Sequence, residues 1–301
     1  MPKPAPEYDI GFVLHPEQDA TYIHFENAAT NPFQPNPSAM SRVNAWWLSE
    51  AALLSYWDPA PAIQIFKSAG LDAEYVNQES TDCYVAWESA VVIVAFRGTE
   101  SDQWRDILSD ARVAQIPWKW SAGQVHVGFA AAVEAIWPKL TLVVDKLAQT
   151  RTVWFCGHSL GAALATLAAD RYARSRGVCT FGSPRVGSPA FAAAFTQKFV
   201  NKTLRFVNDH DVVTHVPPPI LGPWMYRHVD PRRFIDAAGQ ISDGGPMIPH
   251  FFGELVGSPE ALLDIIRATD QGAIGHPPMF LLDHMPKAYA TWIWNDYEAN
   301  G

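Results

Sequence analysis

Residues 153–165 read VWFCGHSLGAALA, and this stretch decides the fold more than any other part of the chain. An apolar, strand-like run ends in the pattern Gly-x-Ser-x-Gly, and an alanine-rich helical pattern follows at once. A sharp strand-to-helix turn of this kind holds a serine hydroxyl out of the backbone and aims free N–H groups at developing charge. Ser159 is therefore the candidate nucleophile. The alternative is a Gly/Ser turn that only lets the helix pack closely on the sheet.

The composition indicates a globular domain and excludes several other classes of protein. The chain has 301 residues, 48% of them hydrophobic, which suits one large α/β domain over 1–301 with a sizeable core. The net charge of −9 argues against nucleic-acid binding and against electrostatic capture by anionic membranes. No apolar run approaches the ~20 residues of a bilayer-spanning helix, so we expect no transmembrane segment.

The N-terminus and the cysteines bear on the cellular compartment. Residues 1–7, MPKPAPE, lack the apolar core of a signal peptide, so we expect a cytoplasmic protein, or a secreted one whose signal has been removed. Three cysteines do not make a disulfide framework, and Cys156 and Cys179 lie in apolar runs where we expect them to be buried. The ten histidines are scattered without metal-ligand spacing, so we predict neither a metal nor a cofactor.

Strand-like and helical patterns alternate along most of the chain. After an irregular arm over 1–40, the expected elements are a helix over 41–57, a break at Pro59 and Pro61, a helix over 63–69, a hairpin of strands 83–87 and 91–96, a helix over 127–147 interrupted near Pro138, strand 152–156, helix 160–174, strand 178–181, helix 190–199 and strand 203–207. Apolar strands alternating with helices are typical of an α/β fold with a mostly parallel sheet covered on both faces. Functional residues of such a sheet lie at the carboxyl ends of its strands.

A nucleophilic serine needs a histidine base and an acid that orients the base. In α/β-hydrolase chains the acid follows the serine and the histidine comes last. The acid candidates, Asp209 and Asp211, lie in the segment RFVNDHDVVTHVPP at 205–218. The base candidates further along the chain are His228, His250, His276 and His284. Chemistry alone does not choose within either set.

Six motifs occur in an order that matches one known family. They are FRGT at 96–99, HVGF at 126–129, GHSLG at 157–161, TFGSPRVG at 180–187, DVVTHVPP at 211–218 and DH at 283–284. Over about residues 41–297 the chain thus resembles the class 3 (filamentous-fungal-type) lipases. The resemblance implies an α/β-hydrolase fold and hydrolysis of carboxylic esters, often triacylglycerols.

The resemblance also implies the roles of individual residues. It makes Ser159 the nucleophile, Asp211 the orienting acid and His284 the base. It makes Thr99 and the backbone N–H of Leu160 the oxyanion hole.

Asp209 is the alternative acid, because it lies only two residues before Asp211. Thr214 stands where the family usually has proline. The interval from Asp211 to His284 exceeds that from Ser159 to Asp211, which suggests extra structure over the site.

Three further motif residues are given structural roles. His158, in the variable position of the elbow, is expected to pack. We expect His126 to anchor a loop by hydrogen bonding and Arg97 to donate hydrogen bonds beside the oxyanion loop.

The segment ESDQWRDILSDA at 100–111 is the candidate lid, within a lid region over 100–120. Trp104, Ile107 and Leu108 fall on one helical stripe together with Ala111. The resemblance implies that this stripe covers the site in water and opens at a lipid–water interface, whereas an ordinary surface helix is the alternative. Candidates for acyl-chain walls, which could equally be core residues, are Trp118, Trp120, Phe251, Phe252, Leu255 and Val256.

We therefore expect a triacylglycerol lipase that acts through an acyl-enzyme on an acylglycerol or another ester. Within the same class, the alternative is an esterase for short-chain, feruloyl or polyester substrates. Outside it, the alternative is a lipase-like binding protein that has lost catalysis. The sequence does not determine the oligomeric state.

Overall fold

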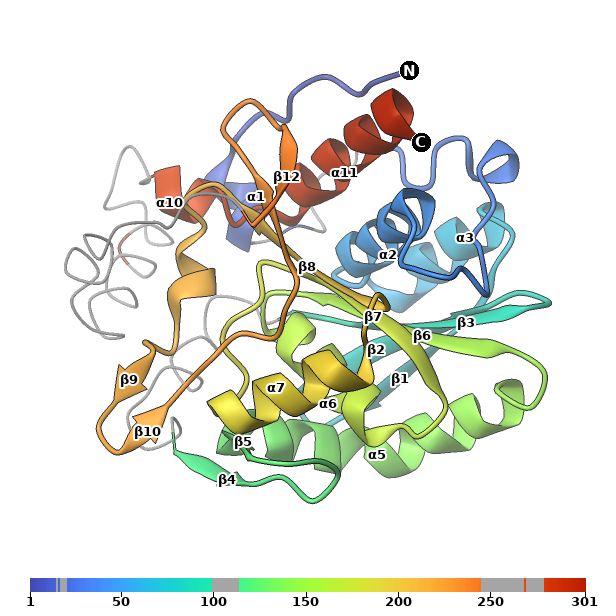
Figure 1. The fold of residues 1–301 in the computed structure, drawn as a ribbon. Coiled ribbons are helices and arrows are strands. Elements are labelled where there is room, and N and C mark those ends of the chain that lie inside the picture. Colours follow the sequence, from blue (N-terminus) through green and yellow to red (C-terminus); the bar gives the residue numbers. More distant parts are fainter. Residues whose placement is uncertain (15, 17–20, 99–113, 245–267, 269–278) are drawn as a thin grey trace.

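The computed structural model describes residues 1–14, 16, 21–98, 114–244, 268 and 279–301. At its centre is an eight-stranded sheet with the strand order β1-β2-β3-β6-β7-β8-β11-β12 (Figure 1). Its strands are β1 Asp72–Gln78, β2 Thr81–Trp87, β3 Val91–Phe96, β6 Thr152–His158, β7 Ser175–Phe181, β8 Thr203–Asn208, β11 Arg232–Ile235 and β12 Ile241–Asp243. The described residues also form two small two-stranded sheets, of β4 (Gln115–Pro117) with β5 (Gln124–His126) and of β9 (Ile220–Leu221) with β10 (Trp224–Met225).

The middle of the sheet is parallel and its margins are antiparallel. Strands β3, β6, β7, β8 and β11 pair in parallel, whereas β1–β2, β2–β3 and β11–β12 are antiparallel. The predicted mostly parallel α/β sheet is confirmed, and the predicted hairpin is β2–β3. The sequence pattern does not predict β1, because polar and apolar residues mix in this half-exposed strand at the sheet margin.

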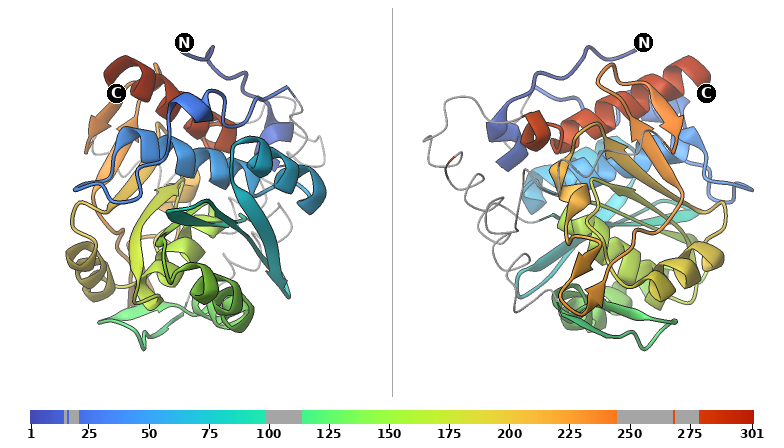
Figure 2. Two further views of the ribbon diagram at one scale, coloured as in Figure 1. Left: turned by 90° about the vertical axis from the view of Figure 1, so that its right-hand side faces the viewer. Right: turned by 60° about the vertical axis from the view of Figure 1, so that its left-hand side comes forward.

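Helices cover both faces of the sheet. One face carries α5 (Val127–Leu147), α6 (Leu160–Arg171) and α7 (Pro189–Lys198), and the other carries α2 (Arg42–Leu54), α3 (Pro59–Ser68) and α11 (Pro286–Asn300), as Figures 1 and 2 show. Strand β3 is apolar throughout because it faces both layers. Val94 and Phe96 join the core on the α5–α6 side, while Ile93 and Ala95 join the core on the α2 side.

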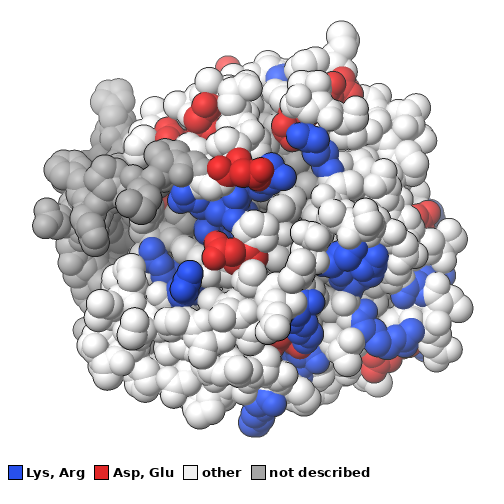
Figure 3. Space-filling view, viewed as in Figure 1, with Lys and Arg blue, Asp and Glu red and all other residues white. Residues whose placement is uncertain are grey.

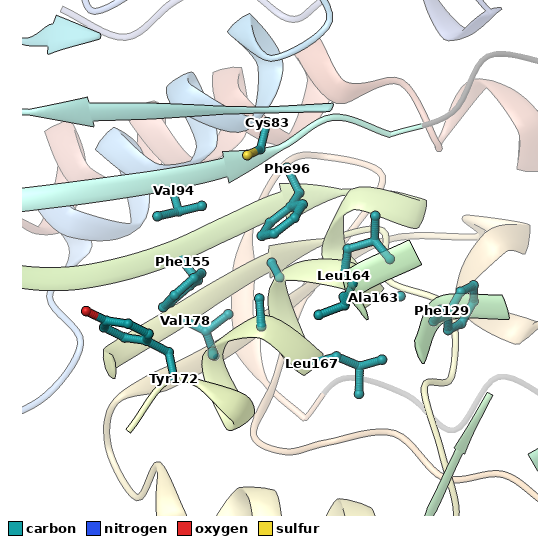
Figure 4. Close-up of a cluster of buried hydrophobic side chains, with 14 of the residues drawn as sticks. Cys83, Val94, Phe96, Phe129, Phe155, Ala163, Leu164, Leu167, Tyr172 and Val178 are labelled. Atoms are coloured by element: carbon teal, nitrogen blue, oxygen red, sulfur yellow. The ribbon is translucent and has the colours of Figure 1, made fainter. Parts of the chain in front are cut away.

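The core beneath α6 combines large strand residues with a helix rich in alanine. In Figure 4 Phe96 lies beside Leu164 of α6, whereas Phe155 lies beside Tyr172 and Val178, and all of these residues are buried. Burying a phenylalanine or leucine side chain stabilises the fold by roughly 1.5–3 kcal/mol. The alanines let α6 approach the sheet closely, which fixes the start of this helix relative to β6.

Helix α2 follows the prediction more closely than α3. The Ser41 hydroxyl caps α2 by accepting the Asn44 N–H at 3.3 Å, and the helix ends at Leu54. The chain does break between the two predicted helices, but the break lies over 55–58, and Pro59 and Pro61 lie in the first turn of α3. The backbone N–H groups of a first turn have no partner within the helix, so proline is tolerated there.

The predicted irregular arm over 1–40 contains two short helices, α1 (Ile10–Leu14) and η2 (Ala28–Thr30). The rest of its described residues are irregular, but aromatic side chains hold the arm to the body. Phe25 packs against Trp47, and Phe33 packs against Trp154. The arm is therefore part of the core on the α2 side.

Helix α5 runs through Pro138 without a break, although an interruption was expected there. Among the described residues it is the one helix whose length and composition alone would allow it to cross a membrane. The expectation that no segment reaches bilayer length is thus too strict. Its Val133, Ile136 and Leu140 are buried in the core, and the helix packs on β1, β2 and α6. Helix α5 therefore packs against one face of the central sheet and contributes to the hydrophobic core there.

Candidate active site

Ser159 lies in a strained turn between β6 and α6. Its φ of 61° is in the left-handed region, which a serine rarely adopts without support from its surroundings. A Cβ on Gly157 would lie 2.3 Å from the carbonyl carbon of Gly161, and a Cβ on Gly161 would lie 2.2 Å from the Phe96 carbonyl oxygen. Both motif glycines are therefore needed for β3, β6 and α6 to meet here. The Leu160 N–H lies at the start of α6, as the predicted elbow requires.

Asp211 and His284 form a buried hydrogen-bonded pair. His284 Nδ1 lies 2.9 Å from both carboxylate oxygens of Asp211. Asp211 precedes the short helix η3 (Val212–His215), and His284 lies just beyond α10 (Met279–Leu282). An ionised carboxylate only accepts hydrogen bonds, so Nδ1 carries the hydrogen and Nε2 is the basic nitrogen of the ring. This is the tautomer that a general base needs.

Tyr289 supports Asp211 from helix α11. Its hydroxyl donates to Asp211 Oδ2 at 2.5 Å and accepts the Asn208 N–H at 3.0 Å, while the Val213 N–H donates to Oδ1 at 2.9 Å. Burial, and then the charge of Asp211, raise the pKa of Tyr289 well above its usual value, so the hydroxyl keeps its proton. The sequence analysis missed this residue. A buried tyrosine hydroxyl needs a partner, but the partner is apparent only in the fold.

Gly182 makes room for the pair. It follows β7 with a φ of +57°, and a Cβ at this position would lie 2.7 Å from Asp211 Oδ2 and 2.9 Å from His284 Nδ1. Gly182 is thus a steric requirement of the acid and the base. In the sequence this glycine is apparent only as part of the motif TFGSPRVG, which does not indicate what it contacts.

The other acid and base candidates have different partners. Asp209 Oδ2 lies 2.9 Å from His210 Nδ1. His228 Nε2 lies 2.7 Å from the Thr214 carbonyl oxygen, and burial lowers the pKa of His228 well below its usual value. The remaining base candidates, His250 and His276, lie outside the described residues. The described contacts favour Asp211 and His284, whose roles stay predictions.

His158 joins the elbow to the base by hydrogen bonds, where simple packing was expected. Its Nε2 lies 2.8 Å from the His284 carbonyl oxygen, and its Nδ1 lies 2.8 Å from the Tyr56 hydroxyl. Since a carbonyl only accepts, Nε2 carries the hydrogen and Tyr56 donates to Nδ1. Burial lowers the pKa of His158 well below its usual value, so the ring is neutral. The Tyr56–His158 chain thereby holds the backbone of His284.

The three residues of the predicted triad gather in one place. Ser159 directly follows His158, whose ring centroid lies 4.4 Å from that of His284, and His284 in turn contacts Asp211. The Ser159 hydroxyl oxygen is buried and has no hydrogen-bond partner among the described residues. A buried hydroxyl of this kind suits a nucleophile whose partners tighten around a substrate.

Several predicted residues lie outside the described part of the chain. These are Thr99 of the oxyanion hole, the lid residues Trp104, Ile107 and Leu108, and the wall candidates over 251–256. Two other wall candidates are described. Trp118 is a core residue that donates to Asp170 Oδ2 at 2.8 Å, and half-exposed Trp120 stacks on Arg171 at 4.6 Å. Neither tryptophan contacts the Asp211–His284 pair in the described structure.

The loops around the acid and the base also bring three possible metal ligands together. One ligand atom from each of Asp209, His210 and Asp283 lies within 4.8 Å of the others. Asp209 and His210 already pair with each other, and Asp283 Oδ2 accepts the His210 N–H at 3.3 Å. These contacts account for the cluster, and the absence of a metal stays a prediction.

His126 has the structural role expected for it. Its Nδ1 accepts the N–H groups of Gly128 and Phe129 and so caps the start of α5. The three cysteines are buried and unbonded, in agreement with the prediction that they do not form a disulfide framework.

Comparisons with known proteins agree on one family. The family model described as "Lipase (class 3)" matches residues 93–220. Secreted mono- and diacylglycerol lipase 1 of Fusarium solani is 34% identical over 175 residues, or 54% of this chain and 48% of that protein. A lipase of Rhizomucor miehei is 34% identical over 143 residues, or 44% of this chain and 39% of that protein. The chain thus spans about half or less of the length of these relatives.

Solved structures match a larger part of the chain. The crystal structure of a mono- and diacylglycerol lipase from Aspergillus oryzae superposes with a TM-score of 0.60 over 83% of this chain and 96% of that chain, at 20% identity. At this identity the likeness shows the fold alone, which is that of the α/β-hydrolases. Over residues 93–220 the chain is similar to the class 3 lipases, and its relatives include lipases.

Proposed function

We propose that this protein is a carboxylic-ester hydrolase that cleaves acylglycerols through Ser159, His284 and Asp211. The observation that carries the proposal is the buried Asp211–His284 pair beside the strained Ser159 elbow. The names of the relatives, lipase and mono- and diacylglycerol lipase, support an acylglycerol as the substrate. We likewise propose that residues 1–301 act as a single α/β-hydrolase domain.

The reaction proceeds in two halves. His284 Nε2 takes the Ser159 hydroxyl proton while Oγ bonds to the ester carbonyl carbon, and it then gives that proton to the leaving alcohol as the ester C–O bond breaks. The product is an acyl-Ser159 intermediate. A water molecule then loses a proton to His284 Nε2 as its oxygen bonds to the acyl carbon. His284 gives that proton to Ser159 Oγ as the acyl–Oγ bond breaks, which releases the carboxylic acid and restores the Ser159 hydroxyl and neutral His284.

Two charges, one negative and one positive, develop in each half of the reaction and need stabilisation. The oxyanion of the tetrahedral intermediate is stabilised by the Leu160 N–H at the start of α6 and, in the proposed hole, by Thr99. The imidazolium of His284 is stabilised by the Asp211 carboxylate, which Tyr289 and the Val213 N–H hold in place. These steps require no cofactor.

The test is the rate of hydrolysis on a series of p-nitrophenyl esters from acetate to palmitate, with Ser159→Ala as the matched control. We expect wild-type hydrolysis with a preference for longer chains, and a loss of about 10⁴ or more in kcat for the variant. Removing a hydroxyl hardly changes packing, so the melting temperature should be unchanged. Activity confined to the shortest esters would favour the short-chain esterase. Near-wild-type activity of Ser159→Ala would remove this serine from the mechanism.

A further inference from the structure

A cavity on the α2 and α11 side of the sheet lies away from the candidate active site. Its volume is about 320 Å³, at the lower end of the range for small-molecule sites, roughly 300–1,000 Å³. Leu204, near the start of β8, and Met40 of the arm both line it. The Met40 N–H donates at 2.7 Å to the carbonyl oxygen of Asn201, just before β8, whereas Asp211 follows the other end of this strand. The cavity is therefore separate from the acid–base pair.

The floor of the cavity is apolar. Leu204 and Phe206 are two residues apart on β8, so their side chains point to the same face of the sheet. Val43 of α2, Ile241 of β12 and Ile293 of α11 also line the cavity. Leu204 and Ile241 are only half-buried, although the other three are core residues. An aliphatic chain in the cavity would cover this remaining apolar surface.

Two arginines line the same cavity. Arg42 is the first residue of α2, and Arg233 lies on β11 beside Phe206 of β8. Arg42 Nε donates to an Asp296 carboxylate oxygen at 2.9 Å. Arg233 Nη1 lies 2.8 Å from a carboxylate oxygen of Asp243, whose side chain is 81% exposed. Exposed ion pairs are weak and a guanidinium has five N–H donors, so both arginines can also bind an anion in the cavity.

The surroundings of the cavity are more basic than the protein as a whole. The chain has 31 acidic and 22 basic residues. Figure 3 nevertheless shows Lys and Arg side chains gathered in the middle and at the right of its view, where Figure 1 places β7, β8 and β12, with fewer Asp and Glu among them. Arg176 and Lys202 both donate to the Pro37 carbonyl oxygen in the arm, three residues before Met40 of the cavity lining. Positive charge around a concave site favours an anionic ligand.

The N-terminal arm forms one wall of the cavity, and its backbone is fixed. The Gln34 N–H donates to Asn44 Oδ1 at 2.8 Å, and the Asn44 side-chain amide donates back to the Gln34 carbonyl oxygen at 2.7 Å. The Tyr297 hydroxyl of α11 donates to Asn31 Oδ1 in the arm at 2.7 Å. Gln34 and Tyr297 are themselves lining residues. A wall that is held in this way loses little conformational entropy when a ligand binds.

We infer that this cavity binds the anion of an aliphatic carboxylic acid. Its chain lies over Leu204 and Ile241, and its carboxylate lies at Arg42 and Arg233. Guanidinium groups match the geometry of a carboxylate, and burial of the chain against the apolar floor adds to the affinity. The same class of molecule is the acid product of the proposed reaction, and only that link rests on the proposed function. The site itself goes beyond that function, because it lies apart from Ser159.

The first test locates the ligand on the protein. The probe is decanoate with a photoreactive diazirine in its chain, added to Ser159→Ala so that no turnover occurs, and peptide mass spectrometry finds the adducts. We expect adducts on the peptides that contain Leu204 and Ile241. An excess of unlabelled decanoate should remove them, whereas decanol, which lacks the charge, and acetate, which lacks the chain, should remove far less.

Three outcomes of this test would overturn the inference. Adducts confined to peptides outside the cavity lining would place the ligand elsewhere. Equal competition by decanol and decanoate would remove the role of the arginines. Stronger competition by decyl phosphate than by decanoate would assign the site to a phosphate head group in place of a carboxylate.

The second test removes the positive charge of one arginine at a time. We expect Arg233→Gln and Arg42→Gln each to weaken decanoate binding by roughly tenfold, which corresponds to one charge-assisted hydrogen bond. Arg174→Gln is the matched control, because it removes the same charge from an exposed arginine that donates to the Ala148 carbonyl oxygen, on the α5 side of the sheet. Melting temperatures establish that each variant is folded. Equal weakening in the control, or no weakening in either cavity variant, would overturn the inference.

The failure of this inference and the failure of the proposed function are distinguishable. With Ser159 intact, Arg233→Gln should hydrolyse dissolved p-nitrophenyl butyrate at the wild-type rate, because the cavity lies away from the acid–base pair. If the wild type hydrolyses esters but decanoate leaves no adduct in the cavity, only this inference fails. If the wild type hydrolyses no ester but decanoate binds as expected, the proposed function fails and the carboxylate site stands.

Discussion

The two halves of the candidate site are built in different ways. The serine half is local: β6, the turn and α6 are consecutive in the chain, and Gly157 and Gly161 allow the close packing that holds Ser159. The acid–base half is assembled from distant segments, with Asp211 after β8 and its partners His284 and Tyr289 near the C-terminus. A short motif can therefore specify the nucleophile, whereas the base depends on tertiary hydrogen bonds.

The largest effect within the acid–base half is expected for Asp211→Asn. A carboxamide N–H would donate to His284 Nδ1, which would leave the hydrogen on Nε2 and prevent it from accepting the serine proton. We expect kcat on a dissolved ester to fall by roughly 10³–10⁴. The matched control is Asp209→Asn, which should change kcat little because that carboxylate pairs with His210. The reverse ranking in parallel kinetics would transfer the acid role to Asp209.

The steric requirement at Gly182 gives the next largest effect. In Gly182→Ala the new methyl group would push against Asp211 and His284, and we expect kcat to fall by about 10², the cost of a displacement on the order of 1 Å. Gly222→Ala is the control, because Gly222 has a φ of +55° against +57° and nothing lies within 4 Å of its Cβ position. Both substitutions place an alanine at a positive φ and so strain the backbone. Equal activities of the two variants would therefore show that the added methyl group at position 182 does not displace Asp211 or His284.

A smaller effect is expected for Tyr289→Phe, which removes the hydroxyl that donates to Asp211. A hydrogen bond to a charged group contributes about 1.5–3 kcal/mol, and the Val213 N–H still holds the carboxylate in this variant, so we expect the lower end of that range: a fall in kcat of roughly tenfold, with little change in KM. Tyr297→Phe on the same helix is the control, since its hydroxyl donates to Asn31 Oδ1 at 2.7 Å, away from the pair. If both variants lose activity equally, Tyr289 supports helix α11 and has no specific role at Asp211.

The smallest effect concerns stability alone. Burial, and then the charge of Asp209, raise the pKa of Asp283 to about 7. Between about pH 4 and pH 7 the folded carboxyl thus holds its proton more tightly than the unfolded one, so the free energy of unfolding falls as the pH rises. The Asp283→Asn variant has no titrating carboxyl at this position, so its free energy of unfolding should lack this pH dependence.

Urea unfolding at about pH 5 and about pH 8 tests this prediction. The wild type should lose roughly 1–3 kcal/mol more than Asp283→Asn between the two conditions. An identical pH dependence of the two proteins would mean that Asp283 does not carry the effect.

Prediction from sequence succeeded where the pattern was local. The elbow around Ser159 and the parallel strands have continuous apolar runs and fixed glycines, so both are apparent in the printed sequence. The edge strand β1 was not predicted, because it has few apolar residues and only one of its seven residues is buried. Pro59 was predicted to break a helix, but it is the first residue of α3. Proline disrupts the interior of a helix and is tolerated in its first turn.

The residues around the acid could not be found in the same way. Asp209 and Asp211 are chemically equivalent in the sequence, and the contacts that distinguish them come from His284, Tyr289 and Gly182. These contacts exist only once β7, β8 and α11 have packed together. The lid over 100–120 and the role of Thr99 stay predictions.

The central claim is that Ser159 is a nucleophile activated by the Asp211–His284 pair. The most direct test is mass spectrometry after reaction with an organophosphonate, which bonds covalently to an activated serine. The account predicts one adduct, on the peptide that contains Ser159, with no adduct in Ser159→Ala and much slower labelling in Asp211→Asn. An adduct on another residue, no adduct on the folded wild type, or equally fast labelling of Asp211→Asn would contradict it.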